Sequence, residues 1–164
     1  MMKDSLILVM LVILTGCQTK PLPEGFPKLY PVSVTITQES KPFEGAKVVL
    51  FSADNSVHWI VSGQTGSNGV AKLVTRGEHK GTPVGEFKVC VTKIYDEPVD
   101  PEPTNPGDWK IWSENLRNHP PKSFSLVEKE FGDIQTTPLS VRISADGEKN
   151  FTFDVGQAIR EQIR

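Results

Sequence analysis

The sequence predicts an all-β protein, a seven-stranded antiparallel sandwich of the Ig-like or prealbumin-like kind with one long proline-rich insertion. Three observations predict it. Short segments with alternating apolar and polar residues recur along the chain, turn residues separate them, and no strong helical period lies between them. The chain has 164 residues, of which 37% are hydrophobic and 23% charged, and this composition fits one ordinary globular domain with short appendages.

The first strand shows the alternation most clearly, because Val32, Val34 and Ile36 take every second position between hydroxyl-bearing residues. The same logic predicts six more strands, at residues 46–51, 57–61, 70–75, 87–94, 139–143 and 151–155. Glycine, proline, asparagine or aspartate falls between them, at residues 41–45, 67–69, 81–85 and 145–147. Short strands joined in this way indicate an antiparallel sandwich rather than an α/β sheet.

The N-terminus carries an export pattern. Lys3 precedes an apolar run over residues 5–14, and Gly16 stands directly before Cys17. A helix over the run would rise only about 15 Å, half of a hydrocarbon core of about 30 Å, so a membrane span is disfavoured. The pattern resembles the lipobox of bacterial lipoproteins, which implies that residues 1–16 are a cleaved signal and that Cys17 carries a diacylglycerol. A plain secretory signal beside a coincidental cysteine is the rival interpretation.

Lipidation at Cys17 implies a membrane anchor, because two or three acyl chains hold a protein durably where one chain does not. Gln18 follows the cysteine in place of the aspartate that retains such proteins at the inner membrane, so the outer membrane is favoured if the organism has one. Residues 17–31 include four prolines and predict an extended tether. The domain is then expected at residues 32–156, followed by a polar tail at 157–164 for which a helix is one option.

Three segments resemble the carboxypeptidase regulatory-like, transthyretin-type domains: residues 41–48 (KPFEGAKV), 65–69 (TGSNG) and 83–89 (PVGEFKV). Residues 131–139 and 150–154 resemble the closing strands of a lipoprotein-borne subgroup. Gly66 departs from the pattern, which has an acidic turn residue there, and no glycine precedes Lys41. The matching residues are mostly turn or core residues, so the resemblance implies the fold more than the function.

The insertion, residues 95–136, interrupts the strand pattern. Residues 95–107 hold four prolines and four acidic residues and are not expected to be regular. Residues 108–118 predict about two turns of helix with Asp108 as N-cap. Long loops on rigid scaffolds often carry function, which makes this insertion the first place to look for a site.

Aromatic residues of the insertion are the candidate ligand contacts. Trp109 and Trp112, with Phe124 nearby, are suited to stacking on a sugar ring or an aromatic ligand. The favoured alternative is that they fasten the insertion to the sandwich, because large aromatic side chains usually bury most of their surface. Trp59 lies in a predicted strand, where packing against the core is expected.

Catalytic and metal-binding patterns are weak throughout. No G-x-S-x-G elbow is present, so a hydrolase triad has no residue to build on, and the three histidines have no metal-ligand spacing. No catalytic residue, metal or cofactor is therefore predicted. Four acidic residues of the insertion could bind Ca²⁺, although a solvated loop fits their interleaved prolines better: Asp96, Glu97, Asp100 and Glu102. The alternative function, a metal-dependent enzyme of transthyretin-like fold, requires ligands from a scattered set: His58, His79, His119 and Tyr95.

Net charge and cysteine content limit the classes of partner and of reactive site that the sequence allows. A net charge of −2 without a basic block gives no source of attraction to phosphate backbones, which disfavours a nucleic-acid partner. With Cys17 lipidated, Cys90 is the only thiol left, and we expect the insertion to cover it. The sequence therefore predicts a non-enzymatic, lipid-anchored cell-envelope module that binds an envelope protein or glycan, or serves as a structural subunit of a larger assembly.

Overall fold

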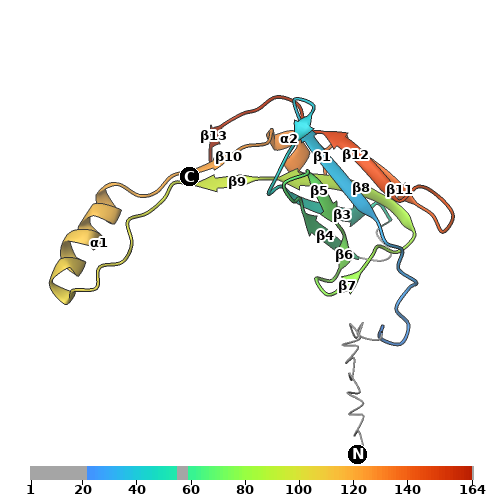
Figure 1. Ribbon diagram of the computed structural model, residues 1–164, viewed down its shortest axis with the longest axis horizontal. Helices are drawn as coiled ribbons and strands as arrows, with labels where there is room; N and C mark the ends of the chain where they lie inside the picture. The colour runs from blue at the N-terminus through green and yellow to red at the C-terminus, as the bar shows by residue number, and fades with distance from the viewer. Residues whose placement is uncertain (1–21, 55–58, 164) are drawn as a thin grey trace, which may run out of the picture.

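The computed structural model describes residues 22–54 and 59–163, and these form an all-β sandwich with a long projection, so the predicted fold class is confirmed (Figure 1). The larger sheet has six strands in the order β11 (Ser140–Ile143), β8 (Gly85–Thr92), β3 (Lys47–Ser52), β4 (Ile60–Gln64), β6 (Val74–Thr75) and β7 (His79–Lys80). The second has β12 (Asn150–Asp154), β1 (Ser33–Gln38) and β2 (Lys41–Pro42), with β5 (Val70–Lys72) also paired to β1.

The core lies between these two sheets. The alternation in β1 buries Val34 and Ile36 completely, and Leu50 of β3 and Val89 of β8 face them from the larger sheet with no exposed surface. Each side chain of this size contributes about 1.5–3 kcal/mol when it leaves water. The sandwich is therefore stabilised in the ordinary way, by apolar burial between two layers.

One strand pairing departs from the antiparallel prediction. β1 and β12 run parallel, with Val34 opposite Phe151 and Ile36 opposite Phe153. Parallel neighbours need a long connection, and here nearly the whole domain separates the two strands in sequence. Alternation within each strand cannot reveal the direction of its partner, so only the tertiary structure decides it.

The tail is a correction to the sequence analysis. A helix was one prediction for residues 157–164. Instead, Glu161–Gln162 form a strand, β13, which pairs with β10 (Ser123–Ser125). β9 (Ile94–Asp96) pairs with the other side of β10, so the three short strands make a separate sheet. These strands carry no apolar alternation of their own, which is why the sequence did not predict β10 or β13.

Part of the predicted tether lies against the sandwich. The Phe26 ring meets the Trp59 ring at 4.8 Å, and the Arg76 guanidinium lies 4.7 Å from the centre of the Trp59 ring. Further along, Tyr30 and Thr82 exchange two backbone hydrogen bonds of 2.9 and 2.8 Å. The segment from Phe26 onward is thus fixed to the domain, and Trp59 packs at the edge of the core beside it.

Residues 1–21 fall outside the described part of the chain, so the signal, the lipobox and Cys17 have no structural account here. Among the residues that are described, no helix has the length and hydropathy needed to cross a bilayer.

Candidate functional site

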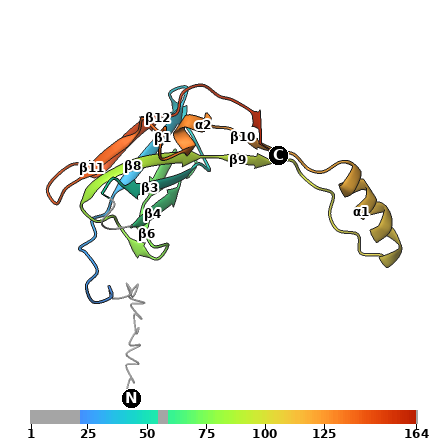
Figure 2. The same cartoon turned by 180° about the vertical axis from the view of Figure 1, so that it is seen from behind.

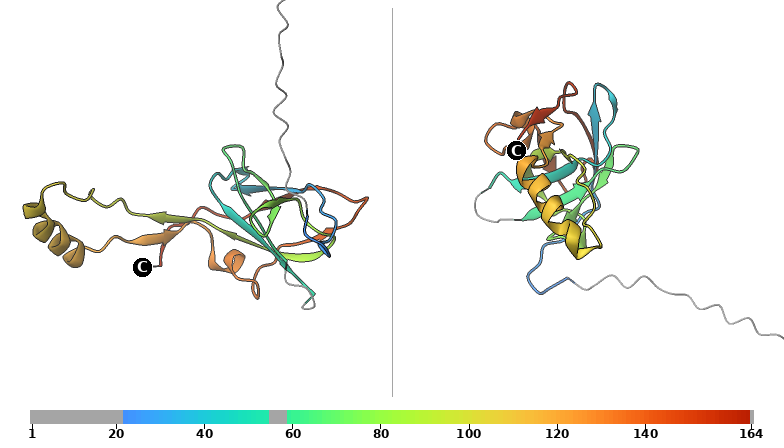
Figure 3. Two further views of the ribbon diagram at one scale, coloured as in Figure 1. Left: turned by 90° about the horizontal axis from the view of Figure 1, so that it is seen from below. Right: turned by 90° about the vertical axis from the view of Figure 1, so that its left-hand side faces the viewer.

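The projection is the feature that separates this chain from a plain sandwich. We call residues 94–125 the arm. Strand β8 leaves the larger sheet and continues after Lys93 as β9, so the arm is an extension of a core strand (Figures 1 and 2). Seen from below, the arm points away from both sheets and carries helix α1 (Trp109–Asn118) at its far end (Figure 3).

Backbone pairing stiffens the base of the arm. Tyr95 lies opposite Phe124 in the β9–β10 pair, and the Glu97 N–H donates to the Lys122 carbonyl at 2.9 Å. On the other side of β10, the Ile163 N–H donates to the Ser123 carbonyl at 2.8 Å. The returning C-terminal tail therefore completes a three-stranded base beneath the arm.

Arg160 fastens this base with its guanidinium group. The group lies 4.2 Å from the centre of the Phe124 ring and 5.0 Å from that of Tyr95. It also lies 3.7 Å from a carboxylate oxygen of Glu97, in an ion pair whose side chains are 55% and 37% exposed. An exposed cation–π contact of this kind contributes about 0.5–1 kcal/mol.

Helix α1 confirms the predicted helix, but it does not fasten the insertion to the sandwich as expected. Asp108 occupies the N-cap position without a side-chain capping bond, and the rings of Trp109 and Trp112 meet edge to face at 5.4 Å. No residue of α1 is buried, and Trp109 is 41% and Ile111 62% exposed. The prediction that the tryptophans fasten the insertion to the sandwich is therefore wrong, because the arm holds them away from it (Figure 2).

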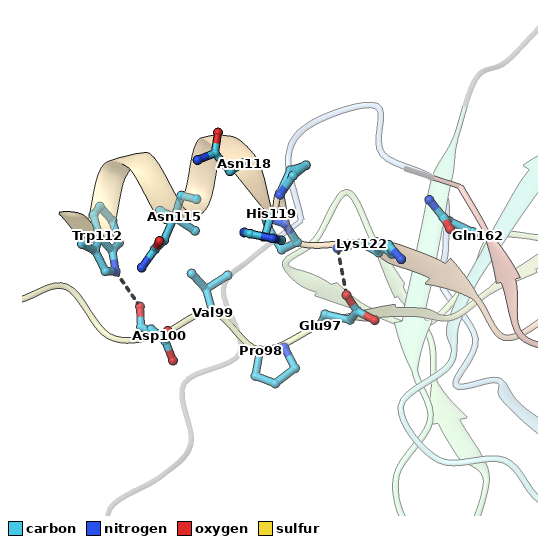
Figure 4. Close-up of a pocket in the computed structure, with 13 residues that line it drawn as sticks. Glu97, Pro98, Val99, Asp100, Trp112, Asn115, Asn118, His119, Lys122 and Gln162 are labelled. Carbon is cyan, nitrogen blue, oxygen red and sulfur yellow. Dashed lines mark hydrogen bonds between the residues drawn. The ribbon is translucent and has the colours of Figure 1, made fainter. Parts of the chain in front are cut away.

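A cleft lies between α1 and the irregular segment that follows β9, residues 97–100. We call it the arm cleft; its volume is about 820 Å³. Trp112 lies at one end of the cleft, where its Nε1–H donates to the Asp100 carbonyl at 3.1 Å and ties the helix to the opposite segment (Figure 4). The lining combines apolar, amide, imidazole and charged side chains: Glu97, Pro98, Val99, Asp100, Trp112, Asn115, Leu116, Asn118, His119, Pro120, Pro121, Lys122 and Gln162.

The structure keeps two of the predicted ligand-contact residues, Trp109 and Trp112, together and separates Phe124 from them. Trp112 lines the arm cleft, while Trp109 packs on Trp112 outside the lining, and Phe124 lies at the base of the arm under Arg160. The sequence analysis did not single out Asn115 as a site residue. Its position one helical turn after Trp112 is the signal that could have found it.

The metal-dependent alternative gains no support from the described residues, where no three histidine, cysteine, aspartate or glutamate side chains come together. His79 lies in β7 of the sandwich with its ring 4.9 Å from Phe26, whereas His119 is the C-cap residue of α1 on the arm. His58 falls outside the described residues. Asp96 and Glu97 of the acidic loop are engaged by their neighbours, since Ser123 donates to Asp96 and Arg160 pairs with Glu97.

Cys90 is buried, as expected, at 4% exposure. The insertion supplies its neighbour, because helix α2 (Lys129–Gly132) packs against β8. Burial raises the pKa of the Cys90 thiol, the Asp133 carboxylate raises it further, and Lys88 opposes the rise. A raised pKa leaves little thiolate near neutral pH, so the thiol is poorly suited to act as a nucleophile.

Comparison with known proteins adds no identification. No protein-family model, curated protein or solved structure gave a significant match to this chain.

Proposed function

We propose that this protein is a lipid-anchored cell-envelope module of the transthyretin-like kind that binds a partner through its arm and catalyses no reaction. The observation that carries the proposal is the arm itself. It holds apolar side chains away from the core in which they would otherwise be buried: Ile94, Tyr95, Val99, Trp109 and Ile111. Exposed apolar surface gathered on one projection marks an interaction site more often than an inert loop.

The anchor rests on the sequence around Cys17. If Cys17 bears the lipid, eight residues separate it from Phe26, the first residue fixed to the sandwich by a ring contact. Fully extended, eight residues span at most about 28 Å. Such a tether holds the sandwich close to the membrane surface, where its arm meets envelope components.

The anchor is tested by intact mass and membrane partitioning in a host that processes lipoproteins. The wild-type chain should lose residues 1–16, gain the mass of its lipid and pellet with membranes, and Cys17→Ala should do none of these. An unmodified Cys17 thiol on a soluble wild-type product would contradict the anchor.

The role of the arm is tested by removing it at its paired base. Asp96 and Ser123 are opposite each other in the β9–β10 pair, so an Asn-Gly turn can replace residues 97–122 and close a two-residue hairpin. Both chains should carry Cys17→Ala so that lipid does not cause pelleting. We expect the shortened chain to keep its β-sheet circular dichroism and to lose retention on envelope material; equal retention would overturn the proposal.

A further inference from the structure

We propose that the arm cleft binds a short, uncharged oligosaccharide, which gives the proposed envelope-binding function its ligand class and rests on that function. Three features of the cleft lead to this ligand: the backbone of one wall, the side chains of the other, and the balance of charge between them.

The wall formed by residues 97–100 offers little backbone for a peptide to pair with. It is irregular, it contains Pro98, and Pro101 and Pro103 follow directly after it; proline has no N–H to donate. The helical wall uses its own backbone groups within α1. An extended peptide that binds by adding a strand needs a ladder of free N–H and C=O groups. Recognition in this cleft must instead come from side chains.

The helical wall presents side chains of the kind that sugars need. Four residues with the i, i+3, i+4, i+7 spacing lie on the face of α1 and its C-cap that lines the cleft: Trp112, Asn115, Leu116 and His119. Leu116 and Val99 supply apolar surface for the C–H faces of a sugar ring, and the indole of Trp112 lines one end of the cleft. Asn115 and His119 point into the space between the helix and residues 97–100 (Figure 4).

The polar groups of Asn115 and His119 are available to a ligand. Within residues 22–54 and 59–163, neither side chain has a hydrogen-bond partner. A carboxamide donates and accepts, and a neutral imidazole does the same with its two nitrogens. Each can therefore pair with a sugar hydroxyl, which also both donates and accepts.

Charge in the cleft is balanced rather than one-sided. Arg160 pairs with Glu97, which leaves the Asp100 carboxylate and the Lys122 ammonium as a lining of no net charge. A strongly acidic or basic ligand gains little from such a lining. The volume of about 820 Å³ lies within the range of small-molecule sites, about 300–1,000 Å³, and leaves room for more than one sugar ring.

The test uses the full chain in detergent, titrated with maltotetraose, cellotetraose and chitotetraose and followed by calorimetry and backbone amide shifts. We expect at least one of them to bind, with shifts over residues 97–100 and 112–119. Asn115→Ala and His119→Ala should each weaken binding about tenfold through the loss of a hydrogen bond. Glu114→Ala, in the same helix but outside the cleft lining, should bind as the wild type does.

Each other outcome overturns the proposal in a distinguishable way. If none of the three sugars binds but the arm is still required for retention on envelope material, the ligand is not a neutral glycan and the proposed function stands with a protein partner. Sugar binding that persists without residues 97–122 places the site elsewhere. Equal weakening by Glu114→Ala would show that the variants disturb the helix rather than a contact.

Discussion

In the sandwich, Val34, Ile36 and Leu50 lose all contact with solvent, whereas in the arm no residue of helix α1 is buried. The two regions are stabilised by different interactions. Apolar burial between two sheets holds the sandwich, while short strand pairs, the Trp112 hydrogen bond and the Arg160 stack hold the arm. A region held by few exposed contacts opens at a lower free-energy cost than a packed core. The arm can therefore adapt to a partner while the sandwich keeps its structure.

The largest expected effect comes from the core. Leu50→Ala removes a fully buried side chain from β3 and should lower the free energy of unfolding by about 2–5 kcal/mol in urea denaturation. Ile111→Ala, at a residue of the arm that is 62% exposed, should change it by less than about 0.5 kcal/mol. Similar losses of unfolding free energy in both variants would contradict the difference between the two regions and show that arm and sandwich unfold as one unit.

A buried hydroxyl at the edge of the sandwich should have the next largest effect. The Thr65 hydroxyl donates to the Phe43 carbonyl at 2.6 Å and accepts from the Ala46 N–H at 2.8 Å. Thr65→Val keeps the shape but leaves both partners unsatisfied, at an expected cost of about 1–3 kcal/mol. Thr152→Val, on an exposed position of β12, is the matched control and should leave the urea midpoint unchanged.

Removal of Arg160 should loosen the arm alone. Arg160→Ala deletes the cation that stacks on Phe124 and Tyr95, a loss of about 0.5–1 kcal/mol. Amide hydrogen exchange should become faster in β10 and β13 and stay unchanged in β3 and β8. As the control, Arg142→Ala removes an exposed ion pair with Glu86 on the sandwich and should leave the arm as it was. Faster exchange across the whole chain would contradict a locally stabilised arm.

The smallest expected effect is on the stability of the fold at low pH. The Thr37 hydroxyl donates to Asp154 at 2.7 Å and lowers the pKa of that carboxyl, with help from the N–H groups of Ser40 and Gly156. A depressed pKa in the folded state contributes stability that is present above the unfolded pKa, about 3.9, and is lost as pH falls through the lower folded value.

The acid effect is measured by urea denaturation at pH 6 and at lower pH for wild type and Asp154→Asn. The difference in unfolding free energy between them should shrink as the pH falls below about 4. Asp146→Asn is the control, because it removes an exposed carboxylate in the turn at residues 145–147. A difference that stays constant with pH would mean that the Asp154 charge does not stabilise the fold.

The elements that depend on local sequence pattern could be predicted before the structure was known. Alternation at Val32, Val34 and Ile36 identified β1, and the Asn68-Gly69 pair identified the turn at residues 67–69. In the structure Gly69 has a positive φ of 74°, and the Val70 N–H donates to the Asn68 carboxamide oxygen. Helix α1 was predicted within a residue of its observed bounds. Each of these features is encoded within a few neighbouring residues.

How these elements pack and pair with one another could not be predicted from the sequence and is set by the fold. It set the parallel pairing of β1 with β12, turned the polar tail into β13, and packed Phe26 of the predicted tether on Trp59. It also continued β8 into the arm, which separated Phe124 from the tryptophans and formed the cleft beneath α1. The physical reason is that each of these contacts joins residues far apart in sequence, and apolar or polar periodicity along one segment carries no information about its distant partner.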